Sequence, residues 1–234
     1  MTDTQGPLKT YYRLTKPGIV YGNILVAAAA FIYASHSGIN WMLFGAAIGG
    51  LALVIASACV VNNYYDRDID ARMERTKQRA FPSGRISARA ALIFSAVLLV
   101  LGVVLLNATN GAVLLAALVG FVVYVFAYTP LKHHSAYALF VGAVAGATPP
   151  LVGYAAAAGV IDYTAWLMFA FLFLWQLPHF LAIAVYRGEE YAAAKIPMFM
   201  KGSYSAQQKK YARWVFYLSL VVLLGWCCAL IVQR

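Results

Sequence analysis

Three oxygen-bearing side chains stand four residues apart where a long apolar segment gives way to charged residues. They are Asn62, Asp66 and Asp70, in the stretch NNYYDRDID. A four-residue step advances a helix by about 6 Å and turns it by only about 40°, so the three side chains would share one face. Mg²⁺ binds through one or two carboxylates and completes its shell with water and phosphate oxygens. The spacing therefore predicts a site for Mg²⁺ and a diphosphate at the end of an apolar segment.

These three residues, hereafter called the ladder, also have a simpler interpretation as a solvated helix end. Two features favour a functional site. The apolar run VIASACVV leads directly into the motif. In addition, Asn62 lies at a depth where a membrane makes polar residues costly, and such residues are usually functional. We therefore expect a binding site at this helix end.

Basic and acidic residues in two later segments are candidates to bind the same anion. The loop ERTKQRAFPSGR follows the ladder, and its Lys77 and Arg79 are expected to neutralise a departing diphosphate. The alternative is that these charges only set membrane orientation. Further along, Arg187, Glu190 and Lys195 would form a second anion clamp or supply a second metal ligand, or else belong to an ordinary polar loop.

A histidine, a lysine and two tyrosines complete the candidate set. His179, in FLWQLPHF, is expected to contact a porphyrin or carry a proton, with a packed structural histidine as the alternative. Lys132, next to two histidines, can bind an anionic group. Tyr65 and Tyr128 are candidates to line a pocket, because aromatic faces stabilise cations. Tyrosines near a membrane surface are also common without any such role.

The composition indicates that membrane-spanning helices position these residues. The 234 residues are 63% hydrophobic and 11% charged, whereas soluble domains carry about 25% charged residues. Windows of about 20 apolar residues predict a multi-pass, all-α bundle. The seven expected spans are 18–35, 41–63, 88–107, 111–129, 136–159, 163–185 and 211–232. Pro149 and Pro150 are expected to interrupt the fifth span, and Pro178 the sixth.

Charged residues fall almost entirely on one side of these spans. Every lysine and arginine except Arg234 lies in the N-terminal segment or in the segments after the second, fourth and sixth spans. Every acid except Asp162 lies there too. Because positive loops stay in the cytoplasm, these segments and the N-terminus are expected to be cytoplasmic. Topology and an anionic substrate explain the net charge of +10, so no nucleic-acid partner is expected.

Several further motifs carry a resemblance to a known family. NxxxDxxxD at 62–70 followed by ERTKQR resembles the UbiA-type intramembrane prenyltransferases. LTKPGIVYGN (14–23), YTPLKHHSAY (128–137) and GATPPLVGY (146–154) are similar in the same order along the chain. WQLPHFLAIAVYR (175–187) and EYAAAKIPM (190–198) resemble the haem-farnesylating branch more than the quinone-forming one.

The resemblance implies an enzyme that transfers a farnesyl group from farnesyl diphosphate to a vinyl group of haem B. The products would be diphosphate and haem O, which serves haem-copper terminal oxidases. Asn62, Asp66 and Asp70 would hold Mg²⁺ as catalytic residues, with Lys77 and Arg79 clamping the diphosphate. The implied substrate-binding residues are Tyr65, Tyr128, Lys132, His179, Arg187, Glu190 and Lys195.

The resemblance also implies a location and departures from the family pattern. The protein would lie in the bilayer of the bacterial plasma (inner) membrane, with a haem A synthase as a candidate partner. The family usually has nine spans, so residues 1–234 are expected to form one domain lacking the last two helices. Glu190 stands where the family commonly carries Asp, and His133 where an arginine is expected after Lys132.

Two other functions stay open from the sequence. One is a UbiA-type prenyltransferase that acts on an aromatic quinone precursor. The other is a seven-span transporter or binding protein without enzymatic activity, which would not need acids at a metal-binding spacing on one face.

Overall fold

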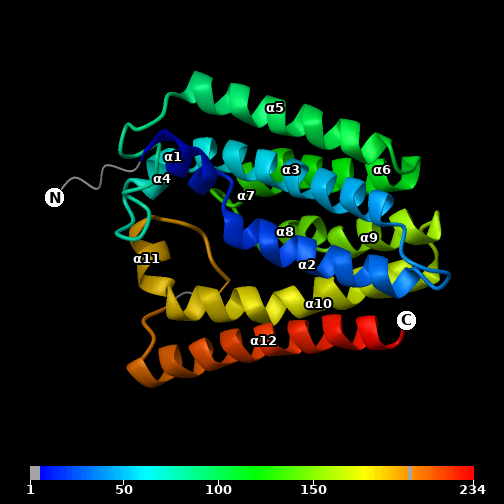
Figure 1. The fold of residues 1–234 in the computed structure, drawn as a ribbon. Coiled ribbons are helices and arrows are strands. Elements are labelled where there is room, and N and C mark those ends of the chain that lie inside the picture. The colour runs from blue at the N-terminus through cyan, green and yellow to red at the C-terminus, as the bar shows by residue number, and fades with distance from the viewer. Residues whose placement is uncertain (1–5, 200–201) are drawn as a thin grey trace.

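The computed structural model describes residues 6–199 and 202–234, and this part of the chain contains helices and no strands. The helices run side by side as an elongated bundle (Figure 1). Their bounds are α1 Pro7–Leu14, α2 Pro17–Ala34, α3 Trp41–Tyr65, α4 Arg67–Asp70, α5 Ala88–Asn107, α6 Gly111–Val122, the π-helix η1 Val123–Tyr128, α7 Thr129–Leu131, α8 Ala138–Gly146, α9 Pro149–Ala158, α10 Tyr163–Tyr186, α11 Gly188–Ala193 and α12 Ala206–Val232.

Among the described residues, seven stretches of helix are long and apolar enough to cross a membrane, which confirms the predicted all-α, multi-pass fold. Most ends fall within two residues of the expected spans. The last span begins at 206 rather than 211, because Ser205 and Gln208 form a reciprocal cap over the polar turn that precedes the apolar residues. The fourth span includes the π-helix η1 between α6 and α7.

Close helix packing depends on small residues at the crossings. α2 contacts α9 and α12, while α3 packs along α5. A Cβ added at Gly153 of α9 would overlap the carbonyl of Ala27 in α2, so these two backbones touch directly. A Cβ at Gly102 of α5 would lie 2.9 Å from the carbonyl oxygen of Gly50 in α3. Small residues allow such approaches between membrane helices.

The three prolines expected to interrupt spans behave differently. Pro149 and Pro150 start a new helix, so the fifth span consists of α8 and α9 as predicted. The expectation for the sixth span is wrong, since α10 continues through Pro178. A proline removes one backbone hydrogen bond, and contacts with neighbouring helices keep α10 continuous. Its Gln176, two residues before Pro178, donates to the carbonyl of Ala143 in α8 at 3.3 Å and to that of Leu172 in α10 itself at 3.0 Å.

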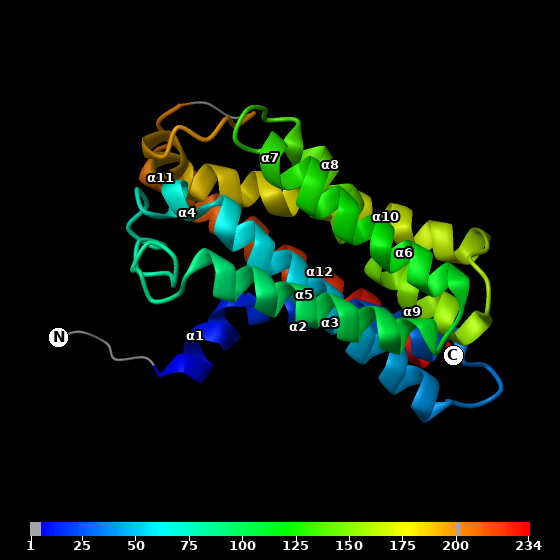
Figure 2. The same ribbon diagram turned by 90° about the horizontal axis from the view of Figure 1, so that it is seen from above.

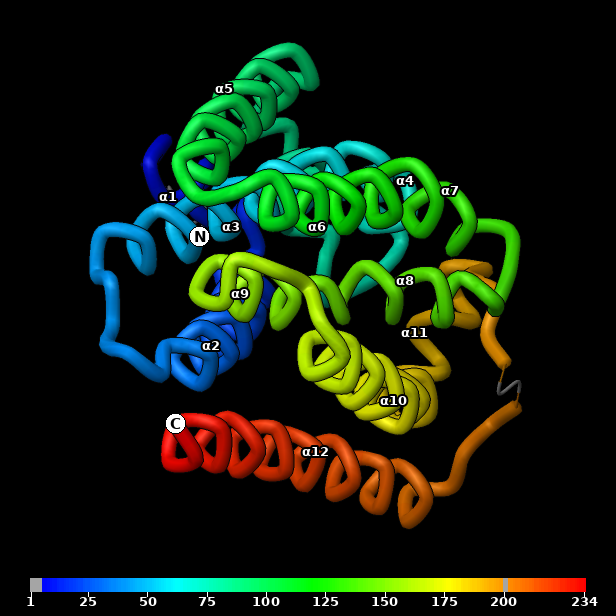
Figure 3. The backbone as a smooth tube through the Cα atoms, turned by 90° about the vertical axis from the view of Figure 1, so that its right-hand side faces the viewer, coloured from blue at the N-terminus to red at the C-terminus, as the bar shows by residue number. Residues whose placement is uncertain are grey.

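The polar segments gather at one end of the bundle. α1, α4 and α11 all lie at the end where the chain starts, on the left of Figures 1 and 2. The view along the bundle in Figure 3 shows α5 and α12 at its outer edges. At the far end, Arg234 donates to the carbonyl of Ser35 at 3.0 Å and Asp162 caps α10. The charge asymmetry in the sequence is therefore an asymmetry between the two ends of the bundle.

Candidate active site

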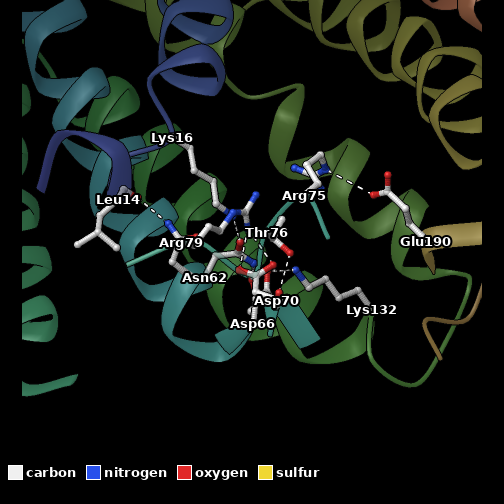
Figure 4. A network of polar contacts seen from close by, with 12 residues as sticks. Leu14, Lys16, Asn62, Asp66, Asp70, Arg75, Thr76, Arg79, Lys132 and Glu190 are labelled. Atoms are coloured by element: carbon white, nitrogen blue, oxygen red, sulfur yellow. Dashed lines mark hydrogen bonds and ion pairs between the residues drawn. The ribbon is translucent and has the colours of Figure 1, made fainter. Parts of the chain in front are cut away.

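The ladder keeps its predicted helical geometry across the junction of α3 and α4. The amide of Asp66 donates to the carbonyl of Asn62 at 2.9 Å, and the amide of Asp70 donates to that of Asp66 at 2.7 Å. These are the hydrogen bonds of a continuous helix, so the three side chains share one face (Figure 4). All three are buried, with exposed fractions of 1%, 6% and 4%.

Each member of the ladder binds one cationic side chain. Lys16 donates to Asn62 Oδ1 and Lys132 donates to Asp66 Oδ2. Arg79 Nη1 lies 3.0 Å and 2.8 Å from the two carboxylate oxygens of Asp70. Three cations from distant parts of the sequence thus converge on one helical face (Figure 4).

The charges around Asp66 keep it ionised. Burial by itself raises the pKa of Asp66. The hydrogen bond with His133, whose Nε2 lies 3.3 Å from Oδ1, and the charges of Lys132 and Lys16 outweigh burial and lower the pKa to about 2. The ladder therefore presents a carboxylate, the form that binds a metal cation.

Lys16 reaches the ladder because the chain turns sharply between α1 and α2. Its backbone is left-handed, with φ of 50°. The following Pro17 is the first residue of α2 and disfavours the right-handed helical conformation at Lys16. The turn separates the two helices and lets the lysine side chain point at Asn62 (Figure 4). Burial lowers the pKa of Lys16 to about 8, against the opposing effect of Asp66.

The fourth span supports the ladder through its π-helical turn. Asn62 Nδ2 donates to Thr129 Oγ1 at 3.0 Å, and that hydroxyl donates to the carbonyl of Tyr124 at 2.8 Å. Single π-helical turns inside α-helices occur frequently at functional sites. Here the turn brings Tyr124 and Tyr128 together, with ring centroids 5.2 Å apart, in the wall of the cavity described next.

A cavity of about 650 Å³ extends from the ladder into the bundle. Its volume lies within the usual range of about 300–1,000 Å³ for ligand sites. Leu51 lines the apolar end, roughly four turns before Asp66 on α3 and therefore about 22 Å along the helix axis. The charged residues in its lining are Lys16, Asp66, Asp70, Arg75, Arg79 and Lys132. The cavity thus joins a long apolar slot to a charged mouth with more cations than carboxylates.

His179 lines the same cavity from α10. The hydroxyl of Ser219 in α12 donates to the carbonyl of Phe216 at 2.6 Å, so it accepts a hydrogen bond from His179 Nδ1, 2.8 Å away. Nδ1 therefore carries the ring proton, and Nε2 keeps the lone pair that can accept a proton or bind a metal. The imidazole also stacks on Trp175, with ring centroids 5.1 Å apart.

The structure does not bring every predicted site residue to the cavity. Asn62, Asp66, Asp70, Arg79, Tyr128, Lys132 and His179 line it, whereas Tyr65, Lys77, Arg187, Glu190 and Lys195 do not. Tyr65 is 45% exposed. Lys77 pairs with Glu74 at 2.6 Å on an exposed part of the loop. Its expected contact with the anion is therefore not seen, because Arg79, two residues later, is the residue that turns toward the ladder.

Glu190 and Arg187 form a separate cluster that adjoins the loop after the ladder. Glu190 Oε2 lies 3.6 Å from Arg75 Nε (Figure 4). The same oxygen lies 3.5 Å from Arg187 Nη1. That oxygen is buried and makes no hydrogen bond to the described residues. Lys195, with φ of 58°, is exposed in the turn after α11.

Sequence reasoning missed three residues at the charged end. Lys16 and Arg75 line the cavity, and Thr129 holds Asn62. Lys16 could have been predicted from the sequence, since it is the last cation before the first apolar span and precedes a proline. Thr129 could not, because its role depends on the π-helical turn.

The donor set fits a hard divalent cation. The ladder offers two carboxylates and one amide oxygen, the ligands that Mg²⁺ prefers. Within residues 6–199 and 202–234, no three His, Cys, Asp or Glu side chains converge on a common point. A Mg²⁺ ion would therefore be held by few protein ligands and would complete its shell with water and phosphate oxygens.

The fold and this site together define a class of membrane-embedded prenyltransferases. A model of the UbiA prenyltransferase family matches residues 23–233, and the chain belongs to this family. The resemblance seen in the motifs is thus confirmed.

Two curated relatives of this chain carry the same enzyme name. The chain is 44% identical over 205 residues to a protoheme IX farnesyltransferase of Marinomonas sp. (strain MWYL1), covering 87% of this chain and 69% of the relative. It is 42% identical over 193 residues to a protein of the same name from Yersinia pseudotuberculosis serotype O:1b (strain IP 31758), covering 82% of this chain and 65% of the relative. The chain spans about two thirds of the length of these relatives.

Solved structures share the fold at low identity. A UbiA homologue from Archaeoglobus fulgidus bound to GPP and Mg²⁺ superposes with a TM-score of 0.73 at 17% identity, covering 92% of this chain and 86% of that chain. The same homologue bound to DMAPP and Mg²⁺ gives a TM-score of 0.72. The likeness shows the UbiA fold, and those proteins bind prenyl diphosphates with a metal.

Proposed function

We propose that this chain transfers a farnesyl group from farnesyl diphosphate to a vinyl group of haem B, while water adds to the other vinyl carbon, giving the hydroxyethylfarnesyl group of haem O and diphosphate. The observation that carries the proposal is one cavity with two unlike ends. A buried ladder with its cations lies at the polar end, and an apolar slot bordered by His179 extends from it. The relatives named protoheme IX farnesyltransferase support haem as the acceptor.

The cations at the polar end suit a diphosphate leaving group. Arg79 and Lys132 are held beside the carboxylates, and Lys16 beside the amide oxygen of Asn62. These groups are fixed before a substrate arrives, so they stabilise the growing negative charge without having to reorganise. Their net positive charge also attracts the anionic head of the donor into the cavity mouth.

We infer that Mg²⁺ is the metal and that Asn62, Asp66 and Asp70 hold it. Bound there, Mg²⁺ would act as a Lewis acid and a template for the diphosphate. The chain itself supplies the burial that keeps bulk water from the allylic carbon of the donor. It also supplies the paired faces of Tyr124 and Tyr128, which favour a cation nearby.

We assign the binding of the acceptor, haem B, to the wall of the large cavity that α10 forms. His179 presents an imidazole with Nδ1 fixed by Ser219, and Trp175 lies alongside it. A flat aromatic acceptor such as haem suits this wall, because stacked rings and a free Nε2 can orient it. A haem A synthase partner follows from the family resemblance alone and stays a prediction.

We assign the polar end of the bundle to the cytoplasmic side of a bacterial inner membrane. The loops and short helices of this end carry nearly all lysines and arginines, and positive loops remain on the cytoplasmic side. A cysteine introduced at Ser83, in the loop after the ladder, should react with a membrane-impermeant maleimide only in inverted vesicles. Labelling in intact spheroplasts would reverse the assignment.

The proposed reaction is tested by incubating the purified chain in lipid nanodiscs with haem B, farnesyl diphosphate and Mg²⁺. Mass spectrometry should detect haem O, and its amount should match the diphosphate released. EDTA should stop both, and added Mg²⁺ should restore them. Prenylation of an aromatic acid without haem O formation would instead support the quinone-precursor alternative.

A further inference from the structure

A second cavity of about 270 Å³ lies on the other side of the loop that follows the ladder. Four arginines line it, namely Arg13 from α1 and Arg75, Arg79 and Arg85 from the loop. No Asp or Glu is among its described lining residues. We call it the arginine cavity, since its electrostatic character is set by guanidinium groups alone.

The arginine cavity shares a wall with the large cavity. Arg75 and Arg79 line both of them. Arg79 contacts Asp70 of the ladder at 2.8 Å (Figure 4). The two cavities therefore adjoin at these two arginines.

Two further details indicate a ligand in the arginine cavity. Asn63 lines it and is only 4% exposed, and its Oδ1 is buried without a hydrogen-bond donor among the described residues. Such an acceptor is satisfied by a water or by a protonated oxygen of a ligand. Arg85 is also oriented, because its Nε donates to Ser83 Oγ at 2.7 Å and its Nη2 donates to the carbonyl of Gln78.

Phosphate oxygens are the ligands that match these features. Guanidinium groups bind phosphates through parallel, charge-assisted hydrogen bonds. Arg75 pairs with Glu190 and Arg79 with Asp70, whereas Arg13 and Arg85 make no ion pair with the described carboxylates, so an anion in the cavity would compensate these two charges. A protonated phosphate oxygen would in addition donate to Asn63 Oδ1. The lining of arginine and amide side chains suits a phosphate group better than a porphyrin or a prenyl chain.

We propose that the arginine cavity is an exit site that binds the diphosphate product after it leaves the ladder. This inference rests on the proposed function, which makes diphosphate a product at the ladder. The shared wall favours diphosphate over the phosphate group of a membrane lipid. Arg75 and Arg79 hand the anion from the reaction site toward Arg13 and Arg85, which are exposed to the aqueous side of the bundle.

The exit site is tested through inhibition by added diphosphate. Haem O formation is measured in phosphatidylcholine nanodiscs at saturating farnesyl diphosphate and constant free Mg²⁺, with inorganic diphosphate as the probe. Saturating donor displaces diphosphate from the ladder, so the remaining inhibition reports the arginine cavity. Arg85→Gln and Arg13→Gln should weaken this inhibition by about three- to tenfold, without changing KM for farnesyl diphosphate.

Matched variants separate this effect from a general loss of charge. Arg85→Lys keeps the charge and should retain part of the inhibition. Arg89→Gln removes an equal charge four residues away, outside both cavities, and should behave as the unaltered protein. Equal inhibition of the Arg85→Gln variant and the unaltered protein would overturn the exit site. So would an effect of Arg85→Gln that occurs only with phosphatidylglycerol in the nanodisc, since this would assign the cavity to a lipid headgroup.

Direct binding distinguishes failure of the exit site from failure of the proposed reaction. Calorimetric titration with diphosphate should show weaker binding to the Arg13→Gln and Arg85→Gln variants than to Arg89→Gln. If the chain makes no haem O but shows this ranking, the proposed reaction fails, while the arginine cavity stands as a diphosphate-binding site. If it makes haem O and all three variants bind diphosphate equally, the exit site fails alone.

Discussion

The two acidic clusters at the polar end of the bundle are built differently. The ladder is buried at the junction of α3 and α4, and its Asp70 lies 2.8 Å from Arg79. Glu190 belongs to the short helix α11, its side chain is 36% exposed, and its arginine contacts are at 3.5 Å and 3.6 Å. Both clusters pair acids with cations, yet only the ladder lines the large cavity.

The difference indicates a division of roles. A buried charge must be compensated by close partners, whereas a partly exposed one is screened by water. The ladder therefore holds a fixed arrangement that can stabilise a reacting anion. The Glu190 cluster joins α11 to the loop after the ladder through Arg75, so it positions a residue of the cavity wall. Replacing one residue at a time in each cluster tests this division.

Asp66→Asn should have the largest effect. The amide keeps the shape but removes the charge that Lys132 and a divalent cation require, so haem O formation should fall by at least about 10²- to 10³-fold. Turnover is measured in nanodiscs at several Mg²⁺ concentrations. The control is Asp68→Asn, because Asp68 is exposed and pairs only with Arg67 at 3.7 Å. Equal activity of the two variants would contradict the metal assignment.

Lys16→Met should have the next largest effect. It removes the cation that holds Asn62, so we expect a loss of about 10- to 100-fold in kcat/KM for farnesyl diphosphate. The exposed Lys9, on the preceding helix α1, provides the matched control Lys9→Met. Circular dichroism in detergent should show that both variants keep their helix content. Unchanged kcat/KM with Lys16→Met would show that this lysine has only a structural role.

The sequence predicted the ladder and the spans because both depend on local spacing. A four-residue step and a run of about 20 apolar residues determine their own geometry. The partners of the ladder could not be predicted in this way. Lys16 and Lys132 reach it from turns elsewhere in the chain, and their positions depend on the turn before α2 and on the π-helical turn in the fourth span.

The loop after the ladder is a second place where the sequence alone could not identify which cation contacts the ladder. Lys77 and Arg79 are equally basic, and the sequence favours neither. In the structure, the Thr76 hydroxyl donates to the carbonyl of Asp70 at 3.0 Å and fixes the loop. Arg79 then reaches Asp70, while Lys77 stays with Glu74. The tertiary path of the loop decides which cation serves the site.

Glu190→Gln should have a moderate effect. The change weakens the ion pair with Arg75 but removes no residue that lines the large cavity. We therefore expect haem O formation to fall by about two- to fivefold. The loss should grow at low salt, where the two arginines repel each other more strongly. Glu189→Gln is the control, since Glu189 pairs with Lys209 on an exposed surface. A loss as large as that of Asp66→Asn would instead place Glu190 at the reaction site.

Lys77→Ala should have the smallest effect, and the comparison with Arg79 makes it informative. Its ion pair with Glu74 is exposed, and pairs of this kind contribute about 0–1 kcal/mol to stability. Activity should stay within about twofold of the unaltered protein, whereas Arg79→Ala exposes the charge of Asp70 and should reduce activity far more. Parallel measurements of kcat and of diphosphate binding check this contrast. If Lys77→Ala lost activity as severely as Arg79→Ala, the loop would have to move during turnover, and the fixed arrangement inferred for the ladder would be wrong.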